Sequence, residues 1–387
     1  MAENAGAGIL ALHDAILFSQ LPGATDACDA PAAPWFAWRG SFTHARAVIR
    51  FLPFLCMSVL AVAAEPWEPL PALPDSLGVA GAFAGESGGA LLVAGGANFP
   101  EKMPWEGGKK VWRDAVWMLD APEGKWREAG RLPRPLGYGV SVTHRGSVVC
   151  VGGSNVQQHY AETFRLSWKD GRLAVEALPA LPIRLSAASG ALVGDTLYVA
   201  CGAEEPGEQQ ATNRAFALDL AAAEPRWHEL PPLPGKPRIL AAGAAAAGRF
   251  YVLGGTVLEK QADGKVVREY LREAWSYRAE EGWRRLADLP RPCVAAPSPA
   301  PVVEGRILLI AGDDGSRVGF QPVEKHPGFP SGILAFDVAQ NRWGEVGTTP
   351  APRATAPCVE WRGRFVIPSG EVRPGVRSPE VWSFRGR

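Results

Sequence analysis

The stretch RFYVLGG, from Arg249 to Gly255, is an apolar, strand-forming run that ends in a pair of glycines. Five further stretches are similar apolar runs that end in one or two glycines: ALLVAGG, SVVCVGG, TLYVACG, RILLIAG and RFVIPSG. The six copies end at Gly96, Gly153, Gly202, Gly255, Gly312 and Gly370. Successive copies are therefore 57, 49, 53, 57 and 58 residues apart, and this regular spacing predicts a fold built from repeated structural units.

Each copy of the repeat has four segments in the same order. A segment of small residues such as GYGVSVTH leads through a turn into the run that ends in glycine; a third strand-like segment, such as AFALDL, follows a variable loop, and the fourth begins at a tryptophan, as in RWHELPPLP. Four short strands per unit are typical of a propeller blade, and a period of about 50 residues resembles the kelch repeat. We therefore predict an all-β, six-bladed kelch-type β-propeller, with the glycines where backbones crowd around the central channel.

The sixth copy lacks its last strand, and the other end of the chain supplies a matching segment. The copy stops at VWSFRGR, whereas EPWEPLPALP, residues 65–74, resembles the tryptophan segment of the other copies. We predict that the strand around Trp67 completes the last blade, which closes the ring and removes an exposed sheet edge. Residues 65–387 then form a single propeller domain. The alternative, a stack of separate β-sandwiches, leaves this complementary segment unexplained.

The residues before the propeller have the pattern of a secretory signal. Residues 46–64 begin with Arg46 and Arg50, continue with an apolar run and end in small residues, as a cleavable signal does. The apolar run is too short to span a bilayer, so we expect no membrane anchor after cleavage and a periplasmic or secreted protein. Residues 1–45 are then interpreted as the product of a start codon assigned too early, the alternative being a genuine extension that carries a buried helix.

Charge and cysteine content exclude several classes of function. The chain has 40 basic and 40 acidic residues, so no global charge attracts nucleic acid or an anionic membrane. The four cysteines of the repeat region show neither CxxC pairs nor metal-ligand spacing with histidine, which predicts no metal site and leaves buried thiols or a disulfide open. These cysteines are Cys150, Cys201, Cys293 and Cys358.

One face of the predicted ring gathers arginines. In a four-stranded blade, the loop after the second strand and the segment leading into the first strand emerge on the same face, and an arginine recurs in that segment in five of the six copies. These residues are Arg134, Arg184, Arg238, Arg291 and Arg353. We predict that they converge on the channel mouth as a site for a carboxylate, which guanidinium groups bind through paired hydrogen bonds. The alternative is that each arginine bonds the carbonyl groups of a neighbouring blade.

The loop GEVRPGVRSPEVW, from Gly370 to Trp382, lies on the same predicted face. Pro374 and Gly375 turn the chain back between Glu371 and Arg377, so both side chains can point into the mouth. Such a pair can be a surface ion pair of little energetic consequence. In an arginine-rich funnel it can instead be a general base beside an anion-binding group.

This loop resembles the active-site segment of the bacterial N-acetylneuraminate mutarotases, also called sialic acid epimerases. That family's pattern, Gly-Glu-x-Lys-Pro-Gly-Leu-Arg-Thr, is matched at Gly370, Glu371, Pro374, Gly375 and Arg377. A second segment, GGANFPEKMPWEGGKKVWRD, matches the family at Gly95, Gly96, Phe99, Glu106, Gly107, Lys109, Lys110 and Asp114, and PLGYGVS around Tyr138 matches a third. In the best-known members the Glu and Arg loop comes first, whereas here it comes last, so the chain resembles a cyclically permuted branch of the family.

The resemblance implies an enzyme that interconverts the α and β anomers of N-acetylneuraminic acid by acid–base ring opening and reclosure, without a cofactor. It implies that Glu371 and Arg377 are catalytic. Together with the face argument, it makes substrate-binding candidates of Arg134, Arg184, Arg238, Arg291, Arg353, Asn98, Phe99, Glu106, Lys109, Lys110 and Tyr138. The expected partner is a small sugar acid, and assembly into homodimers is left open. The alternative function is an exported kelch-type module that binds a sugar acid or a protein without catalysis.

Overall fold

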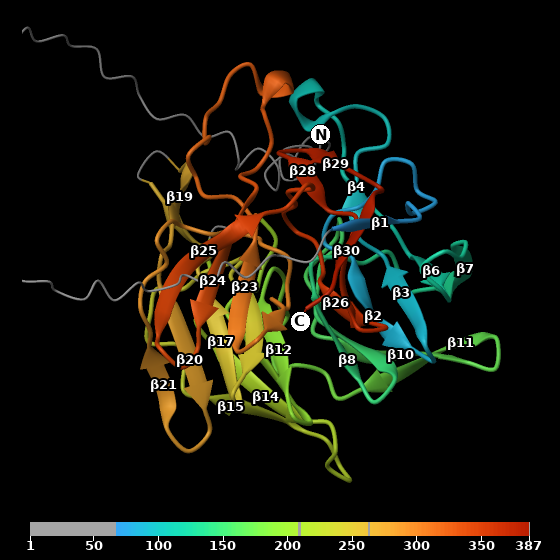
Figure 1. The fold of residues 1–387 in the computed structure, drawn as a ribbon, viewed down its shortest axis with the longest axis horizontal. Helices are drawn as coiled ribbons and strands as arrows, with labels where there is room; N and C mark the ends of the chain where they lie inside the picture. The colour runs from blue at the N-terminus through green and yellow to red at the C-terminus, as the bar shows by residue number, and fades with distance from the viewer. Residues whose placement is uncertain (1–66, 208–209, 262–263, 387) are drawn as a thin grey trace, which may run out of the picture. The chain divides into compact units, whose positions relative to one another are not determined.

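The structure is a computed structural model that describes residues 67–207, 210–261 and 264–386 (Figure 1). The predicted signal at residues 46–64 and the preceding residues 1–45 lie outside the described residues. Within the described ranges the protein is all-β, apart from the short 3-10 helices η2 (Pro104–Glu106) and η3 (Val323–Lys325). In this part of the chain no helix has the length and apolar character needed to cross a bilayer.

The first three blades are four-stranded antiparallel sheets. Blade 1 consists of β2 (Phe83–Ser87), β3 (Ala90–Ala94), β6 (Ala115–Leu119) and β7 (Arg127–Arg131). Blade 2 consists of β8 (Val140–His144), β9 (Ser147–Val151), β10 (Thr163–Lys169) and β11 (Arg172–Leu178). Blade 3 consists of β12 (Ser189–Val193), β13 (Thr196–Ala200), β14 (Ala215–Asp219) and β15 (Trp227–Leu230).

The other three blades have the same strand order. Blade 4 consists of β16 (Ala242–Ala246), β17 (Arg249–Leu253), β20 (Ala274–Arg278) and β21 (Gly282–Arg285). Blade 5 consists of β22 (Val302–Val303), β23 (Arg306–Ile310), β24 (Gly332–Asp337) and β25 (Arg342–Thr348). Blade 6 consists of β26 (Val359–Trp361), β27 (Arg364–Pro368), β30 (Val381–Phe384) and β1 (Glu68–Leu70). The predicted six-bladed propeller is confirmed.

Blade 6 combines strands from both ends of the chain. β1 pairs antiparallel with β30, with Glu68 opposite Ser383. Trp67 lies just before β1, and its ring centroid is 4.6 Å from that of Phe384. The predicted closure of the last blade by the amino-terminal strand is therefore confirmed, and the outer edge of β30 is paired rather than exposed.

In four of the six blades, the recurring tryptophan joins the blade to the one before it. Four indole N–H groups donate to a backbone carbonyl just beyond the fourth strand of the preceding blade. These bonds run from Trp126 to Pro71, from Trp227 to Pro179, from Trp283 to Pro231 and from Trp343 to Ala287, at 2.7 to 2.9 Å. Each hydrogen bond contributes about 1 kcal/mol to the stability of the fold, in addition to the packing of the indole ring. The tryptophan therefore stabilises the junction between two blades as well as its own blade.

The terminal glycine of each repeat lies where two backbones meet. Gly202 has a φ of 105°, and a Cβ atom there would lie 2.6 Å from the carbonyl oxygen of Ser186. Gly153 has a φ of 104°, and its Cβ atom would lie 2.7 Å from the oxygen of Gly137. The crowding predicted from the sequence is confirmed, and the crowding groups belong to the segment that leads into the first strand.

A closed ring of hydrogen bonds surrounds the central channel. One residue per blade donates its N–H to the carbonyl of its counterpart in the preceding blade, at 2.7 to 2.9 Å. These residues, which we call the rim, are Gly81, Tyr138, Ala187, Leu240, Ala295 and Thr355. The bond from Gly81 to Thr355 links blade 1 to blade 6, so the ring is complete at the junction of the chain ends. All six have a positive φ, which directs the N–H and carbonyl groups around the ring.

The four cysteines of the propeller are free thiols in the core. Burial raises the pKa of Cys201, Cys293 and Cys358 to about 12, and that of Cys150 also rises. A thiol that stays protonated is a poor nucleophile and a poor metal ligand. Of the two readings left open by the sequence, the structure therefore supports buried thiols.

Candidate functional site

The residue after the terminal glycine of each repeat lies beside the rim. It forms an isolated β-bridge with the residue that precedes the rim residue of its own blade, as Glu371 does with Ala354. The equivalent residues in blades 1 to 6 are Ala97, Ser154, Ala203, Thr256, Asp313 and Glu371. In three blades a two-stranded hairpin rises from this point, and these hairpins lie on one face of the ring (Figure 1). They are β4 (Ala97–Asn98) with β5 (Val111–Trp112), β18 (Thr256–Lys260) with β19 (Val266–Tyr270), and β28 (Glu371–Arg373) with β29 (Val376–Arg377).

The carboxylate of Glu371 is held by its own hairpin. The residue is 4% exposed, and its Oε1 accepts a hydrogen bond of 2.6 Å from the N–H of Gly375. The hydroxyl of Thr355, a rim residue, lies 3.4 Å from Oε2, but its shorter hydrogen bond is to the carbonyl of Ala354 at 2.8 Å. Nη1 of Arg377 lies 3.9 Å from Oε1, at the outer limit of an ion pair. The turn predicted from Pro374 and Gly375 thus orients the carboxylate, while the guanidinium lies beside it.

Arg377 points from blade 6 to the aromatic ring of Phe99 in blade 1. Its guanidinium carbon is 4.6 Å from the ring centroid. Lys110 approaches the same ring, with Nζ 5.9 Å from the centroid of Phe99, 5.6 Å from that of Trp112 and 5.1 Å from that of Tyr138. Cations are attracted to aromatic faces at such distances. Five sequence-predicted residues therefore come together in what we call the mouth cluster: Glu371, Arg377, Phe99, Lys110 and Tyr138.

The turn of the β28–β29 hairpin packs on the loop of blade 1. A Cβ atom at Gly375 would lie 2.5 Å from Cγ of Pro104 and 3.2 Å from the ring of Trp105, both in η2. The two family-like segments lie at opposite ends of the chain, and the closed ring makes them neighbours across the junction of blades 6 and 1. A closed ring keeps the same blade neighbours wherever the chain begins, so this contact agrees with the cyclic permutation inferred from the sequence.

Three other candidates from the blade 1 loop lie apart from the mouth cluster or have local roles. Glu106 is exposed, and its Oε2 accepts the N–H of Met103, which caps η2. Lys109 is exposed. Asn98 is buried and donates to Asp75 and to the carbonyl of Gly78, which fastens the segment leading into blade 1. Substrate binding by these three residues stays a prediction.

The five recurring arginines bond groups of their own blades. Three pair with a glutamate that directly precedes the third strand of the blade, and these pairs are Arg134 with Glu162, Arg238 with Glu273 and Arg353 with Glu380. Arg291 donates to the carbonyl of Gly332 at 2.9 Å, and Arg184 pairs with Glu205. Arg238 is fully buried, and it also donates to the carbonyls of Lys236 and Gly254. Substrate binding by these five arginines stays a prediction. Their bonds within the blades explain why an arginine recurs at this position of the repeat.

Sequence reasoning missed Asp313, the counterpart of Glu371 in blade 5. Its Oδ2 accepts the hydroxyl of Tyr270 at 2.8 Å, and its Oδ1 accepts the N–H of Gly315 at 3.0 Å. Burial and the neighbouring Asp313 raise the pKa of Tyr270, so this phenol stays protonated. The signal was present in the sequence, because Asp313 directly follows the glycine of RILLIAG just as Glu371 follows that of RFVIPSG.

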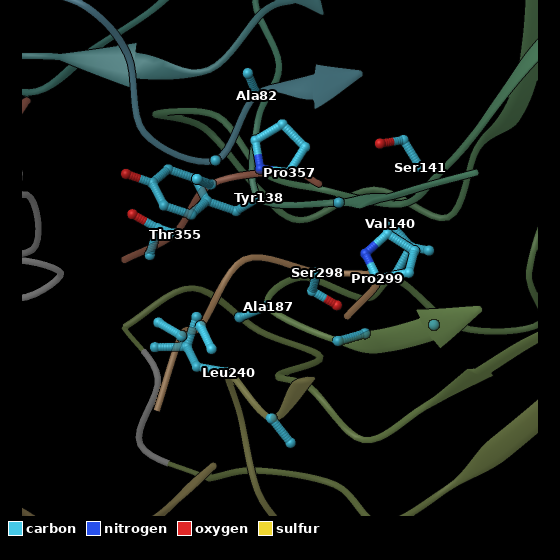
Figure 2. A pocket seen from close by; sticks show the side chains of 18 residues that line it. Ala82, Tyr138, Val140, Ser141, Ala187, Leu240, Ser298, Pro299, Thr355 and Pro357 are labelled. Carbon is cyan, nitrogen blue, oxygen red and sulfur yellow. The ribbon is translucent and has the colours of Figure 1, made fainter. Parts of the chain in front are cut away.

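The central channel is narrow and lined by small residues (Figure 2). Tyr138, Leu240 and Thr355 lie at its rim, and Ser298 and Pro299 line it further along. Its cavity volume is about 80 Å³, whereas small-molecule pockets measure roughly 300 to 1,000 Å³. A ligand of the size that such pockets bind therefore does not fit inside the channel. Among the described residues, no group of three or more His, Cys, Asp or Glu side chains could hold a metal ion.

Comparison with known proteins identifies similar chains. The family model of N-acetylneuraminate epimerase matches residues 60–175 and 178–318. The N-acetylneuraminate epimerase of Salmonella arizonae is 39% identical over 118 residues, 28% of this chain and 30% of that protein. The protein of the same name from Yersinia pestis is 37% identical over 126 residues, 28% of this chain and 32% of that protein. The chain thus matches about a third of the length of these curated relatives.

Proposed function

Because the chain belongs to the N-acetylneuraminate epimerase family, we propose that it interconverts the α and β anomers of N-acetylneuraminic acid. The observation that carries the proposal is the mouth cluster. It combines a buried, oriented carboxylate, Glu371, with the two cations Arg377 and Lys110 at the mouth of the ring. A carboxylate able to move a proton beside groups able to bind an anion is what an acidic sugar with a reactive anomeric centre requires.

Ring opening and ring closure each move one proton between two oxygen atoms of the sugar, and the composition of the sugar does not change. Glu371 takes the proton of the C2 hydroxyl, the bond between C2 and the ring oxygen breaks, and the protonated Glu371 gives this proton to the ring oxygen, which leaves the open keto form. Rotation about the bond next to C2 then presents the other face of the C2 carbonyl to the hydroxyl. Glu371 takes the proton of this hydroxyl as the ring closes and gives it to the C2 oxygen, which becomes the new C2 hydroxyl. The carboxylate is regenerated at the end of the cycle.

The cations have a separate role in this mechanism. Arg377 and Lys110 bind the carboxylate on C1 and stabilise the negative charge that develops on the C2 oxygen as the ring opens. Burial of the mouth cluster strengthens this interaction, because charges interact more strongly where water is excluded. The N–H of Gly375 keeps the carboxylate of Glu371 in one orientation, so less ordering is needed during the reaction.

We also propose that the protein is exported. The support is the pattern of residues 46–64, with its basic start, apolar run and small residues at the end. A periplasmic or secreted location gives the enzyme access to sialic acid released outside the cell.

Proton NMR of freshly released α-N-acetylneuraminic acid tests the proposal. The α and β signals are followed over time with and without the purified protein. We expect a faster approach to the equilibrium mixture with the protein, and a rate close to the spontaneous one with a Glu371→Gln variant of unchanged melting temperature. An unchanged exchange rate with the folded wild-type protein would instead favour the alternative of a binding module without catalysis.

A further inference from the structure

A second cavity lies on the same face, between the loops of blades 1 and 2. Its volume is about 480 Å³, within the range of small-molecule pockets. We call it the blade 1–2 pocket. The lining residues that matter here are Lys110, Trp112, Arg134, Asn155, Gln157 and Tyr160. It is several times larger than the cavity in the central channel, so it has room for part of a sugar.

The walls of the blade 1–2 pocket are fixed by the protein's own hydrogen bonds and ring contacts. Oδ1 of Asn155 accepts the N–H of Gln157 at 2.8 Å, which shapes the loop of blade 2. Arg134 is held by Glu162 at 3.0 Å, and its guanidinium carbon lies 4.8 Å from the ring centroid of Tyr160. A site that is already ordered loses less entropy when it binds a ligand.

The chemistry of the lining suits a polar ligand with apolar faces. Trp112 and Tyr160 offer aromatic surface, Gln157 offers an amide and Lys110 is a cation, whereas the charge of Arg134 is paired with Glu162. Of the described residues that line the pocket, none is acidic. Such a lining favours a molecule with hydroxyl and amide groups that carries negative charge and not positive charge.

Lys110 connects this pocket with the mouth cluster. It lines the pocket, and its Nζ approaches the ring of Phe99, on which the guanidinium of Arg377 also lies. A molecule whose carboxylate contacts Lys110 therefore lies next to the pocket, and its remaining groups can reach the pocket. In N-acetylneuraminic acid, the carboxylate and the reactive hydroxyl share C2, whereas the acetamido group on C5 and the three-carbon chain on C6 lie across the ring.

We propose that the blade 1–2 pocket is the subsite for the acylamino group and the polyhydroxyl chain of the acidic sugar. The inference rests on the proposed function for the identity of the sugar. It goes further because it assigns recognition of the sugar's substituents to the blade 1–2 pocket. Trp112 and Tyr160 pack against the apolar edge of these substituents. The exposed amide of Gln157 hydrogen-bonds their hydroxyl groups.

The test fills the pocket without removing any group of the mouth cluster. Val156 lines the pocket and is 52% exposed, so Val156→Trp adds bulk there without disturbing the core. Val175→Trp is the matched control, because Val175 is also exposed and lies in β11, the outer strand of the same blade. Gln157→Ala removes the proposed hydrogen bond without adding bulk. The melting temperature is measured for all three variants.

Binding is measured by calorimetry with N-acetylneuraminic acid and with an eight-carbon 3-deoxy-2-keto sugar acid, which has a hydroxyl in place of the acylamino group and a two-carbon chain in place of the three-carbon chain. We expect Val156→Trp to weaken binding of N-acetylneuraminic acid by about tenfold or more, in line with steric discrimination in pockets. Gln157→Ala should weaken it by roughly fivefold, the effect of one hydrogen bond. Neither change should weaken binding of the smaller acid comparably, and Val175→Trp should affect neither sugar.

Equal losses for both sugars, or no loss in either pocket variant, would overturn the inference. Because binding is measured apart from anomer exchange, the two proposals fail in different ways. A wild-type protein that binds N-acetylneuraminic acid without accelerating exchange refutes the proposed function and leaves the pocket to be decided by the variants. A folded wild-type protein that binds neither sugar refutes both.

Discussion

Two kinds of carboxylate–guanidinium pair occur on the same face of this propeller. The blade pairs are Arg134 with Glu162, Arg238 with Glu273 and Arg353 with Glu380, and each joins the segment before the first strand to the residue before the third strand. The mouth pair, Glu371 with Arg377, lies within one hairpin. The blade pairs are close, at 3.0 Å for Arg134 and 2.7 Å for Arg353, whereas the atoms of the mouth pair are 3.9 Å apart.

The difference follows from what else each group contacts. In the mouth pair, the carboxylate accepts the N–H of Gly375 and the guanidinium lies on the ring of Phe99 in another blade. In the blade pair of Arg238, the guanidinium bonds a carboxylate and two carbonyls around it, and the residue is fully buried. We infer that the blade pairs stabilise the fold and that the mouth pair is arranged to act on a ligand.

Removing each glutamate in turn gives the largest contrast. Glu371→Gln should slow anomer exchange by roughly 10² to 10⁴, the usual contribution of a general base, with little change in melting temperature. Glu273→Gln should do the reverse, lowering the melting temperature while the folded protein keeps its exchange rate. NMR measurements of anomer exchange and thermal unfolding of both variants test this. A loss of exchange in Glu273→Gln but not in Glu371→Gln would mean that the blade pair, and not the mouth pair, takes part in the reaction.

Arg377→Met should reduce kcat/KM for anomer exchange by about 10² to 10³, because it removes a group that stabilises developing charge. Arg377→Lys should recover only part of the loss, since an ammonium group cannot form two parallel bonds to a carboxylate. Initial rates over a range of sugar concentrations separate kcat from KM. Full activity in Arg377→Met would mean that other residues bind the carboxylate of the sugar.

Arg238→Met should lower the free energy of unfolding by about 3 kcal/mol. The reason is that it leaves Glu273 without its buried partner, and breaking such a pair is strongly destabilising. Urea unfolding followed by tryptophan fluorescence measures the change. A loss below about 1 kcal/mol would mean that the blade pair is no stronger than a surface ion pair.

Arg134→Met tests the same repeat position in a more exposed setting. The side chain of Arg134 is 41% exposed, so water screens its pair with Glu162 and the expected loss is less than about 1 kcal/mol. The same urea experiment compares it directly with Arg238→Met. Similar losses in the two variants would show that burial does not set the strength of the blade pairs.

The pH dependence of stability should reflect the blade pairs. Burial alone would raise the pKa of Glu273, but hydrogen bonds from Arg238 and Trp275 hold it below its ordinary value of 4.5. Burial and the bonds from Trp382 and Arg353 have the same combined effect on the pKa of Glu380. A lowered pKa in the folded state contributes stability that is complete above the unfolded value and is lost as the pH falls through the folded value.

We therefore expect the midpoint of urea unfolding to be independent of pH near neutrality and to decrease when the pH is lowered below about 4.5. The fall should be shallower when Glu273 and Glu380 are both replaced by Gln, because these carboxyls no longer take up protons on unfolding. An identical acid slope in the double variant would assign the acid sensitivity to other carboxyls.

The sequence by itself determined the repeat and its closure. The six glycine-terminated runs predicted six blades, and the tryptophan segment before β1 predicted the strand that completes the sixth, because strand pairing within a blade is local and is recorded in periodic patterns. The turn between Glu371 and Arg377 was also readable, since Pro374 and Gly375 favour it. These features depend on neighbours along the chain or on one repeated unit.

Only the tertiary structure decided which residues meet across blade junctions. Phe99 and Arg377 are far apart in sequence and meet because the ring closes between blades 6 and 1. The sequence pattern of the five arginines was compatible with a position at the mouth or within their own blades. The structure shows that three of them pair with Glu162, Glu273 and Glu380. The blade 1–2 pocket likewise exists only between loops of different repeats. A periodic pattern specifies each unit, whereas a site between units depends on distances that closure of the whole ring sets.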